Sequence, residues 1–131
     1  ISVFDISNPQ KPAVKQSYKY DRYPDSVTVK DNYAYVARAE SGTDIIKIND
    51  DGSLELIKNI PVNGVYAHYA AVSWKKTFVI KDGADIYDIS DPKNPVFLNH
   101  ISSNGEAVRA AVDNGHIYFG DGYAGMTIAK I

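Results

Sequence analysis

The feature that most constrains this chain is an internal repeat. Four alternating patches each close on an isoleucine, and the spacings between them are 42, 41 and 42 residues: Ile6, Ile48, Ile89 and Ile131. A second marker recurs 43 and 40 residues apart: Val29, Val72 and Val112. A third follows with the same two spacings: Tyr35, Phe78 and Tyr118. Because independent markers keep one period, the chain is built from repeated structural units.

Each unit reads as four short strands. In the complete middle unit, alternating apolar residues predict strands at residues 66–73, 76–81, 85–90 and 96–101. Turn residues separate them, including Asp82-Gly83 and the proline-rich stretch at 91–95. No segment has the periodicity of an amphipathic helix. A period of about 40–45 residues made only of strands predicts an all-β fold, an arc of four-stranded antiparallel β-propeller blades.

The repeats also resemble a known family. The segments ISVFDISNPQKP (1–12), VTVKDNYAYVA (27–37), ADIYDISDPKNPVFL (84–98) and AVDNGHIYFGDGYAGMTI (111–128) resemble the LVIVD-repeat β-propellers. The second unit departs, because IIKINDDGSLELI (45–57) lacks the proline turn. The resemblance implies radial repetition of blades and a secreted, periplasmic or cell-surface bacterial protein. It implies little about activity, because propellers carry many functions.

The repeat divides the chain into parts of four blades. We expect one partial propeller over residues 1–131, with the outer strands of a first blade at 1–20, complete blades at 21–60 and 61–101, and three strands of a fourth blade at 102–131. Such an arc does not close on itself. We expect the chain to be a piece of a longer propeller, with association of several copies as the alternative. The expected partner is therefore the remainder of the propeller or another copy of the chain.

Composition excludes several classes of protein. The net charge is −2, which argues against a nucleic-acid partner, since phosphate binding needs a basic surface. No run approaches the roughly 18 apolar residues of a membrane span. The chain has no cysteine, which excludes thiolate metal sites and cysteine nucleophiles. We expect no cofactor and no metal site.

The candidate binding residues lie in the loops that lead into the innermost strands. These loops, at residues 20–26, 61–69 and 102–109, should surround one mouth of the central channel, and they are called the mouth loops below. Aligning the units predicts a polar and aromatic group there that would suit a carbohydrate or a peptide: Tyr23, Asp25, Tyr66, His68, Tyr69, Glu106 and Arg109. The ten tyrosines and Trp74 are otherwise expected to fill the interfaces between blades.

Three functions follow from this pattern. The favoured one is a non-catalytic binding or scaffold module that presents loops at the channel mouth, without catalytic residues. The second is a hydrolase or lyase in which His68, Asp25 and Glu106 act as acid–base groups or as metal ligands. The third is a structural spacer that associates through its blade edges, by strand addition at residues 2–6 or 127–131.

Overall fold

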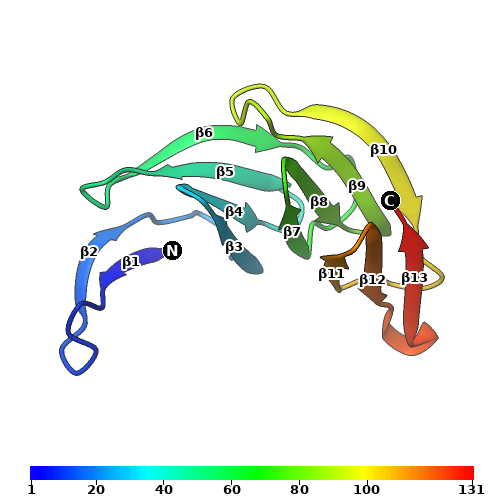
Figure 1. The fold of residues 1–131 in the computed structure, drawn as a ribbon, viewed down its shortest axis with the longest axis horizontal. Helices are drawn as coiled ribbons and strands as arrows, with labels where there is room; N and C mark the ends of the chain where they lie inside the picture. Colours follow the sequence, from blue (N-terminus) through cyan, green and yellow to red (C-terminus); the bar gives the residue numbers. More distant parts are fainter.

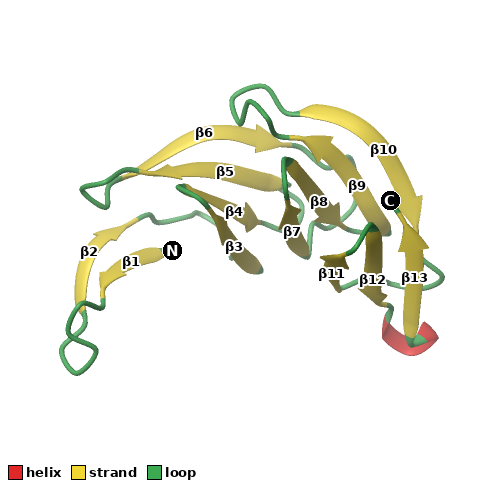
Figure 2. Cartoon of the chain, viewed as in Figure 1, coloured by secondary structure: helices red, strands yellow, loops and turns green.

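The chain forms four separate antiparallel sheets that follow one another along an arc (Figure 1). The computed structural model describes residues 1–131. Strands make up nearly all of its regular structure, and the only helical segment is a single 3-10 turn, Gly122–Ala124, before the last strand (Figure 2). No helix is long and apolar enough to cross a membrane. The predicted fold class, an all-β arc of four-stranded propeller blades, is confirmed.

In every sheet the strands lie side by side in chain order. The first sheet contains β1 (Ser2–Asp5) and β2 (Ala13–Ser17). The second contains β3 (Ser26–Lys30), β4 (Tyr33–Ala37), β5 (Thr43–Ile48) and β6 (Leu54–Ile60). The third contains β7 (Tyr69–Ser73), β8 (Lys76–Ile80), β9 (Gly83–Asp88) and β10 (Val96–Ser102). The fourth contains β11 (Arg109–Asp113), β12 (His116–Gly120) and β13 (Met126–Lys130).

Two of the four strands in the third sheet begin at residues other than those predicted from the sequence. β7 begins at Tyr69 and not at residue 66, and β9 begins at Gly83 and not at residue 85. The reason at β7 is a backbone bridge between Ala67 and Ala39 of the neighbouring sheet, with N···O distances of 3.0 and 3.2 Å. This bridge holds residues 66–68 against the second sheet, and the regular ladder starts only after them.

The sheets pack face to face through three apolar clusters. Between the first two sheets lie Ala34, Val36 and Ile46. Between the second and third lie Tyr35, Ile45, Ala70 and Val79, among others, and burial raises the pKa of Tyr35 to about 12. Between the third and fourth lie Phe78, Ile80, Ile117 and Phe119, among others. Full burial of one such side chain contributes about 1.5–3 kcal/mol, so each sheet depends on its neighbours for stability.

The proline turns of the family motif are built from side chain–backbone hydrogen bonds. In each, an Asp or Asn side chain accepts a hydrogen bond from the backbone N–H two residues later, which is an Asx turn. The pairs are Asp5 with Ser7 (2.9 Å), Asn8 with Gln10 (3.1 Å), Asp88 with Ser90 (2.7 Å) and Asp91 with Lys93 (3.0 Å). The repeated Asp-Ile-Ser sequence therefore ends the third strand of a blade and starts its outer turn.

Two glycines at the second hairpin of the complete blades let the outer strand approach closely. Gly42 has φ 81° and Gly83 has φ 132°, backbone conformations that favour glycine. A Cβ at Gly42 would lie 2.1 Å from the carbonyl oxygen of Ile60, and one at Gly83 would lie 2.2 Å from that of Ile101. Side chains at these positions are therefore excluded by space as well as by φ.

The prediction that Trp74 fills a blade interface is wrong. Trp74 lies at the tip of the β7–β8 hairpin and is 90% exposed. Its backbone has φ 56°, which turns the residue out of the strand and away from the neighbouring sheet.

Each of the two end sheets has one uncovered apolar face. In the fourth sheet the cross-strand row Ala111–Tyr118–Ile128 is partly exposed, whereas the row at the same repeat position in the third sheet, Ala71–Phe78–Ile86, is buried. In the first sheet Phe4, Ile6 and Val14 are exposed. These faces match, by repeat position, the faces that are buried between sheets elsewhere in the chain.

Candidate functional site

The three mouth loops lie on the same side of the arc, because each of them leads into the innermost strand of its sheet. The start of an innermost strand and the turn between its second and third strands lie at the same end of an antiparallel sheet. The β4–β5 turn therefore lies beside the loops leading into β3 and β7, and the β8–β9 turn beside those leading into β7 and β11. Contacts place β7 between β3 and β11, so the three loops are neighbours.

Three of the predicted site residues are in direct contact. His68 Nδ1 lies 3.7 Å from Asp25 Oδ2, which joins two neighbouring mouth loops. The rings of Tyr66 and His68 stack with their centroids 6.0 Å apart and their planes 15° apart. All three side chains are partly exposed, so a ligand has access to them.

Glu106 shares a groove with two of these residues. The groove has a volume of about 420 Å³ and draws its lining from two mouth loops and the β8–β9 turn. Its polar side chains are those of Tyr66, His68, Lys81, Asp82 and Glu106. Groups of both charges therefore face the same space.

The other predicted residues lie apart from this groove. Tyr69 and Arg109 form a separate pair, with the Arg109 guanidinium carbon 5.4 Å from the centre of the Tyr69 ring. Tyr23 is 90% exposed and lines a different groove of about 490 Å³, together with residues 17–22. The structure thus groups Asp25, Tyr66, His68 and Glu106; whether the predicted residues bind a ligand stays a prediction.

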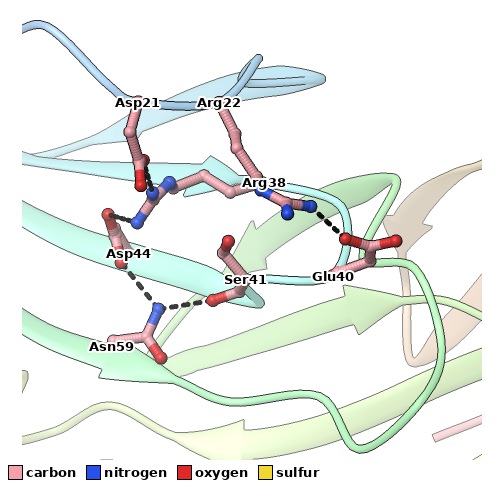
Figure 3. A network of polar contacts seen from close by, with 7 residues as sticks. All are labelled: Asp21, Arg22, Arg38, Glu40, Ser41, Asp44 and Asn59. Atoms are coloured by element: carbon pink, nitrogen blue, oxygen red, sulfur yellow. Dashed lines mark hydrogen bonds and ion pairs between the residues drawn. The ribbon is translucent and has the colours of Figure 1, made fainter.

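A polar network beneath the mouth was not predicted from the sequence (Figure 3). Its centre is Arg38, whose guanidinium lies 3.0 Å from Asp44 and 3.0 Å from Asp21. Asp44 is only 1% exposed and also accepts a hydrogen bond of 2.7 Å from Asn59. Asn59 in turn donates to the Ser41 carbonyl oxygen at 2.8 Å. The network joins the 20–26 loop to the β4–β5 turn and the outer strand β6.

A short chain of contacts connects the same region to the groove. Arg22 forms an ion pair with Glu40, which Figure 3 shows at the edge of the network. The other Glu40 oxygen accepts a 2.8 Å hydrogen bond from the Tyr66 hydroxyl. This hydrogen bond and the negative charge of Glu40 raise the pKa of Tyr66 above its usual value. Tyr66 is therefore held in place as a neutral phenol.

The third sheet carries the same arrangement with different residues. Asp85, at the position of Asp44, lies 3.0 Å from Lys81 and accepts a hydrogen bond of 2.7 Å from His100 Nδ1. Burial alone would lower the pKa of Lys81, but the hydrogen bond and charge of Asp85 raise it. Lys81 is thus a fixed cation at the wall of the groove.

The sequence contains a signal for the polar pairs of Asp44 with Asn59 and of Asp85 with His100, namely a constant spacing between the two partners. The third-strand residue and its outer-strand partner are opposite each other, and the same register pairs Ser2 with Ser17, whose hydroxyl oxygens lie 2.9 Å apart. In all three sheets the partners are 15 residues apart.

The fourth sheet anchors its mouth loop through a buried carboxylate. Asp121 follows β12, is fully buried, and accepts hydrogen bonds from the Asn104 backbone N–H at 3.0 Å and from the Thr127 hydroxyl. Burial would raise the pKa of Asp121, but the hydrogen bonds that it accepts outweigh this effect and lower it. The 102–109 loop is thereby tied to β13.

The arrangement suits recognition of a polar ligand better than metal binding. No group of three or more His, Asp or Glu side chains is placed to hold a metal ion. The groove instead offers a fixed ammonium, two carboxylates, an imidazole and a phenol.

Comparison with known families supports the repeat assignment. The sequence model of the LVIVD repeat matches residues 1–20 and 21–62. Searches of curated proteins and of solved structures found no match. The two matched stretches correspond to the first two sheets, whose pattern continues through the third and fourth. The two matches support assignment of the chain to the LVIVD-repeat family, and its sheets form a propeller-like repeat module.

Proposed function

We propose that this protein is a non-catalytic binding module that holds a short polar segment of a partner protein at the channel mouth. The observation that carries the proposal is the convergence of Tyr66, His68, Lys81 and Glu106 on one groove from separate loops. A peptide offers charged groups of both signs and backbone amides, which match the mixed charges of this groove.

Preorganisation supports the proposal. The polar contacts to Glu40 and Asp85 hold Tyr66 and Lys81 in place before a ligand arrives. Side chains that are already ordered lose less conformational entropy on binding, which improves affinity. A rigid propeller module with ordered mouth loops is suited to display of this kind.

A peptide-display selection tests the proposal. A phage library of random dodecapeptides is selected on the wild-type protein, and the enriched peptides are titrated against the variants His68→Ala and Glu106→Gln. We expect each variant to bind at least about tenfold more weakly, a change of about 1.4 kcal/mol. Glu55→Gln on the exposed part of β6 is the matched control and should bind like wild type. Failure to enrich any peptide, or equal binding by all variants, would overturn the proposal.

The contact between His68 and Asp25 supports a second candidate, a hydrolase or lyase at the same mouth. A histidine beside a carboxylate, with Glu106 in the same groove, is an arrangement that acid–base catalysis uses. At 3.7 Å the two side chains are too far apart for a hydrogen bond, so the carboxylate does not orient the imidazole. Turnover of p-nitrophenyl esters or glycosides that is lost in His68→Ala would favour this candidate.

The uncovered faces of the end sheets support a third candidate, a structural role through association. The row Ala111–Tyr118–Ile128 repeats a row that is buried between the third and fourth sheets. We propose that a sheet of the same repeat covers it, from the remainder of a longer propeller or from another copy of the chain.

A further inference from the structure

The tip of the β7–β8 hairpin carries a residue that its backbone disfavours. Trp74 has φ 56°, and the same hairpin position in the second and fourth sheets is held by Asp31 (φ 52°) and Asn114 (φ 46°). Asp and Asn tolerate left-handed backbone, whereas a bulky residue there is strained. Trp74 contributes to none of the three core clusters and is 90% exposed. Packing therefore does not explain why a tryptophan stands at this position.

Trp74 borders a groove at the end of the strands opposite the mouth. The groove has a volume of about 910 Å³ and lies between the β7–β8 and β11–β12 hairpins, which are neighbours in Figure 1. Val112 and Ile131 contribute apolar surface to it, and its volume lies within the range of small-molecule sites. The mouth groove shares no lining residue with it.

Two tyrosine positions of the preceding interface are not tyrosine at the interface that holds this groove. At the preceding interface, between the second and third sheets, Tyr33 and Tyr87 pack against the core cluster. The equivalent positions at the interface between the third and fourth sheets, by the spacings of the repeat, are Lys76 and Ala129. Neither residue replaces the volume of a tyrosine ring, so space remains beside Trp74.

The chemistry of the lining is that of a site for hydroxyl groups. Lys75 and Lys76 are balanced by Asp88 and Asp113, so the groove has no net formal charge. Asn114 adds an amide that both donates and accepts hydrogen bonds. A flat exposed indole beside these groups offers an apolar surface for the C–H face of a sugar ring.

We propose that the groove beside Trp74 binds a neutral oligosaccharide, with the indole as the stacking surface and the neighbouring Lys, Asp and Asn side chains as hydrogen-bond partners of the hydroxyl groups. This site is separate from the mouth groove and does not depend on the function proposed for it. It also explains the strained backbone, because strain of this kind is retained where a side chain is needed for function.

Trp74 is the only tryptophan, so its fluorescence reports on this groove directly. The protein is titrated with cellohexaose, xylohexaose, mannohexaose and chitohexaose while the emission spectrum is recorded. We expect a saturable change in emission with at least one of them, because stacking removes the indole from water. No saturable change with any of the four would overturn the proposal.

Three variants separate the site from its surroundings. Lys76→Tyr restores the tyrosine of the preceding interface, keeps the fluorophore, and should weaken binding at least about tenfold. Trp74→Asn restores the residue type of the other hairpins and should abolish binding in calorimetric titrations, with an unchanged circular dichroism spectrum. His68→Ala, in the mouth groove, should bind the oligosaccharide like wild type. Binding that survives both groove substitutions, or a response to a proline decapeptide and to none of the sugars, would refute the proposal.

Discussion

At the scale of single residues, the backbone conformation of Trp74 has a cost that can be measured. A left-handed conformation costs an ordinary L-residue about 1–2 kcal/mol, and asparagine tolerates it better. The exposed indole regains little of this through packing. A tryptophan at this position therefore lowers the stability of the hairpin.

Replacing this residue should stabilise the protein. We expect Trp74→Asn to raise the free energy of unfolding by about 1 kcal/mol, because the backbone strain is relieved while no core contact is lost. Urea unfolding followed by circular dichroism measures the change. Asn114→Trp, the reverse substitution at the equivalent hairpin, should destabilise by a similar amount. A loss of stability in Trp74→Asn would show that the indole packs against the fold.

The buried ion pair beneath the mouth leads to a second prediction. Arg38→Met leaves the carboxylate of Asp44 buried without its cation, and we expect the free energy of unfolding to fall by about 3 kcal/mol. Arg22→Met removes the exposed partner of Glu40 and should change it by less than about 1 kcal/mol. Equal effects of the two substitutions in chemical denaturation would contradict the importance of burial.

The lowered pKa of Asp121 predicts how the free energy of unfolding depends on pH. Its pKa is lowered in the folded protein, so its contribution is present above the usual aspartate pKa of about 4 and is lost as the pH falls through the folded value. We expect Asp121→Asn to lower the free energy of unfolding by about 1–3 kcal/mol at pH 7, since it disturbs buried hydrogen bonds. The difference from wild type should shrink below about pH 4. A difference that stays constant from pH 7 to pH 3 would rule out this ionisation as the cause.

At the scale of elements, the outer hairpin of each blade is held by a cross-strand polar pair at one fixed position. Blade by blade the pair is Ser2–Ser17, Asp44–Asn59 and Asp85–His100. The pair occupies the same position in each blade, whereas the residue types that form it differ. Close to each pair the register of the two strands shifts.

Exchange between blades tests this equivalence. His100→Asn gives the third sheet the pair of the second, and we expect stability at pH 7 within about 0.5 kcal/mol of wild type. His100→Val removes the hydrogen bond to Asp85 and should lower the free energy of unfolding by about 1 kcal/mol. Thermal and urea unfolding of both variants provide the comparison. If asparagine proved as damaging as valine, the two pairs would not be equivalent.

The elements were largely predictable from the sequence, and the site was less so. Alternating apolar residues and turn residues locate the strands, because strand period and turn chemistry are local properties. The start of β7 was misplaced because its preceding residues pair with Ala39, a contact between sheets that local pattern does not reveal. The exposure of Trp74 contradicts the interface expected for it, because its backbone has the left-handed conformation that Asp31 and Asn114 adopt at the same hairpin position. The residues of the network around Arg38 come from three segments, and only the three-dimensional packing brings them together.

At the scale of the whole molecule, stability comes from contacts between sheets that repeat along the arc. The two larger core clusters are each formed by two neighbouring sheets, and the smallest joins the second sheet to Ile1 and Tyr20, so the clusters are links in a linear series. The apolar faces of the first and fourth sheets are the ends of this series. The proposed association through these faces follows the same packing rule as the interior.

A charge on an end face tests this association. We expect the wild-type chain to associate as its concentration rises, and Ile128→Lys to reduce association at least about tenfold, because lysine replaces apolar surface that association would bury. Leu56→Lys, at an exposed position of the interior second sheet, is the matched control. Size-exclusion chromatography with light scattering gives the mass of each species. A wild-type chain that stays monomeric at all concentrations would contradict association between copies of the chain.

The register shifts in the outer hairpins have a consequence for solubility. An irregular pairing bends a strand and increases its local twist, and the shifts occur where β2, β6 and β10 pair with the strands inside them. A bent strand is a poor template for the flat stacking of cross-β fibrils. We therefore expect the outer strands β2, β6 and β10 to resist addition to amyloid fibrils, although each lies at the edge of its sheet.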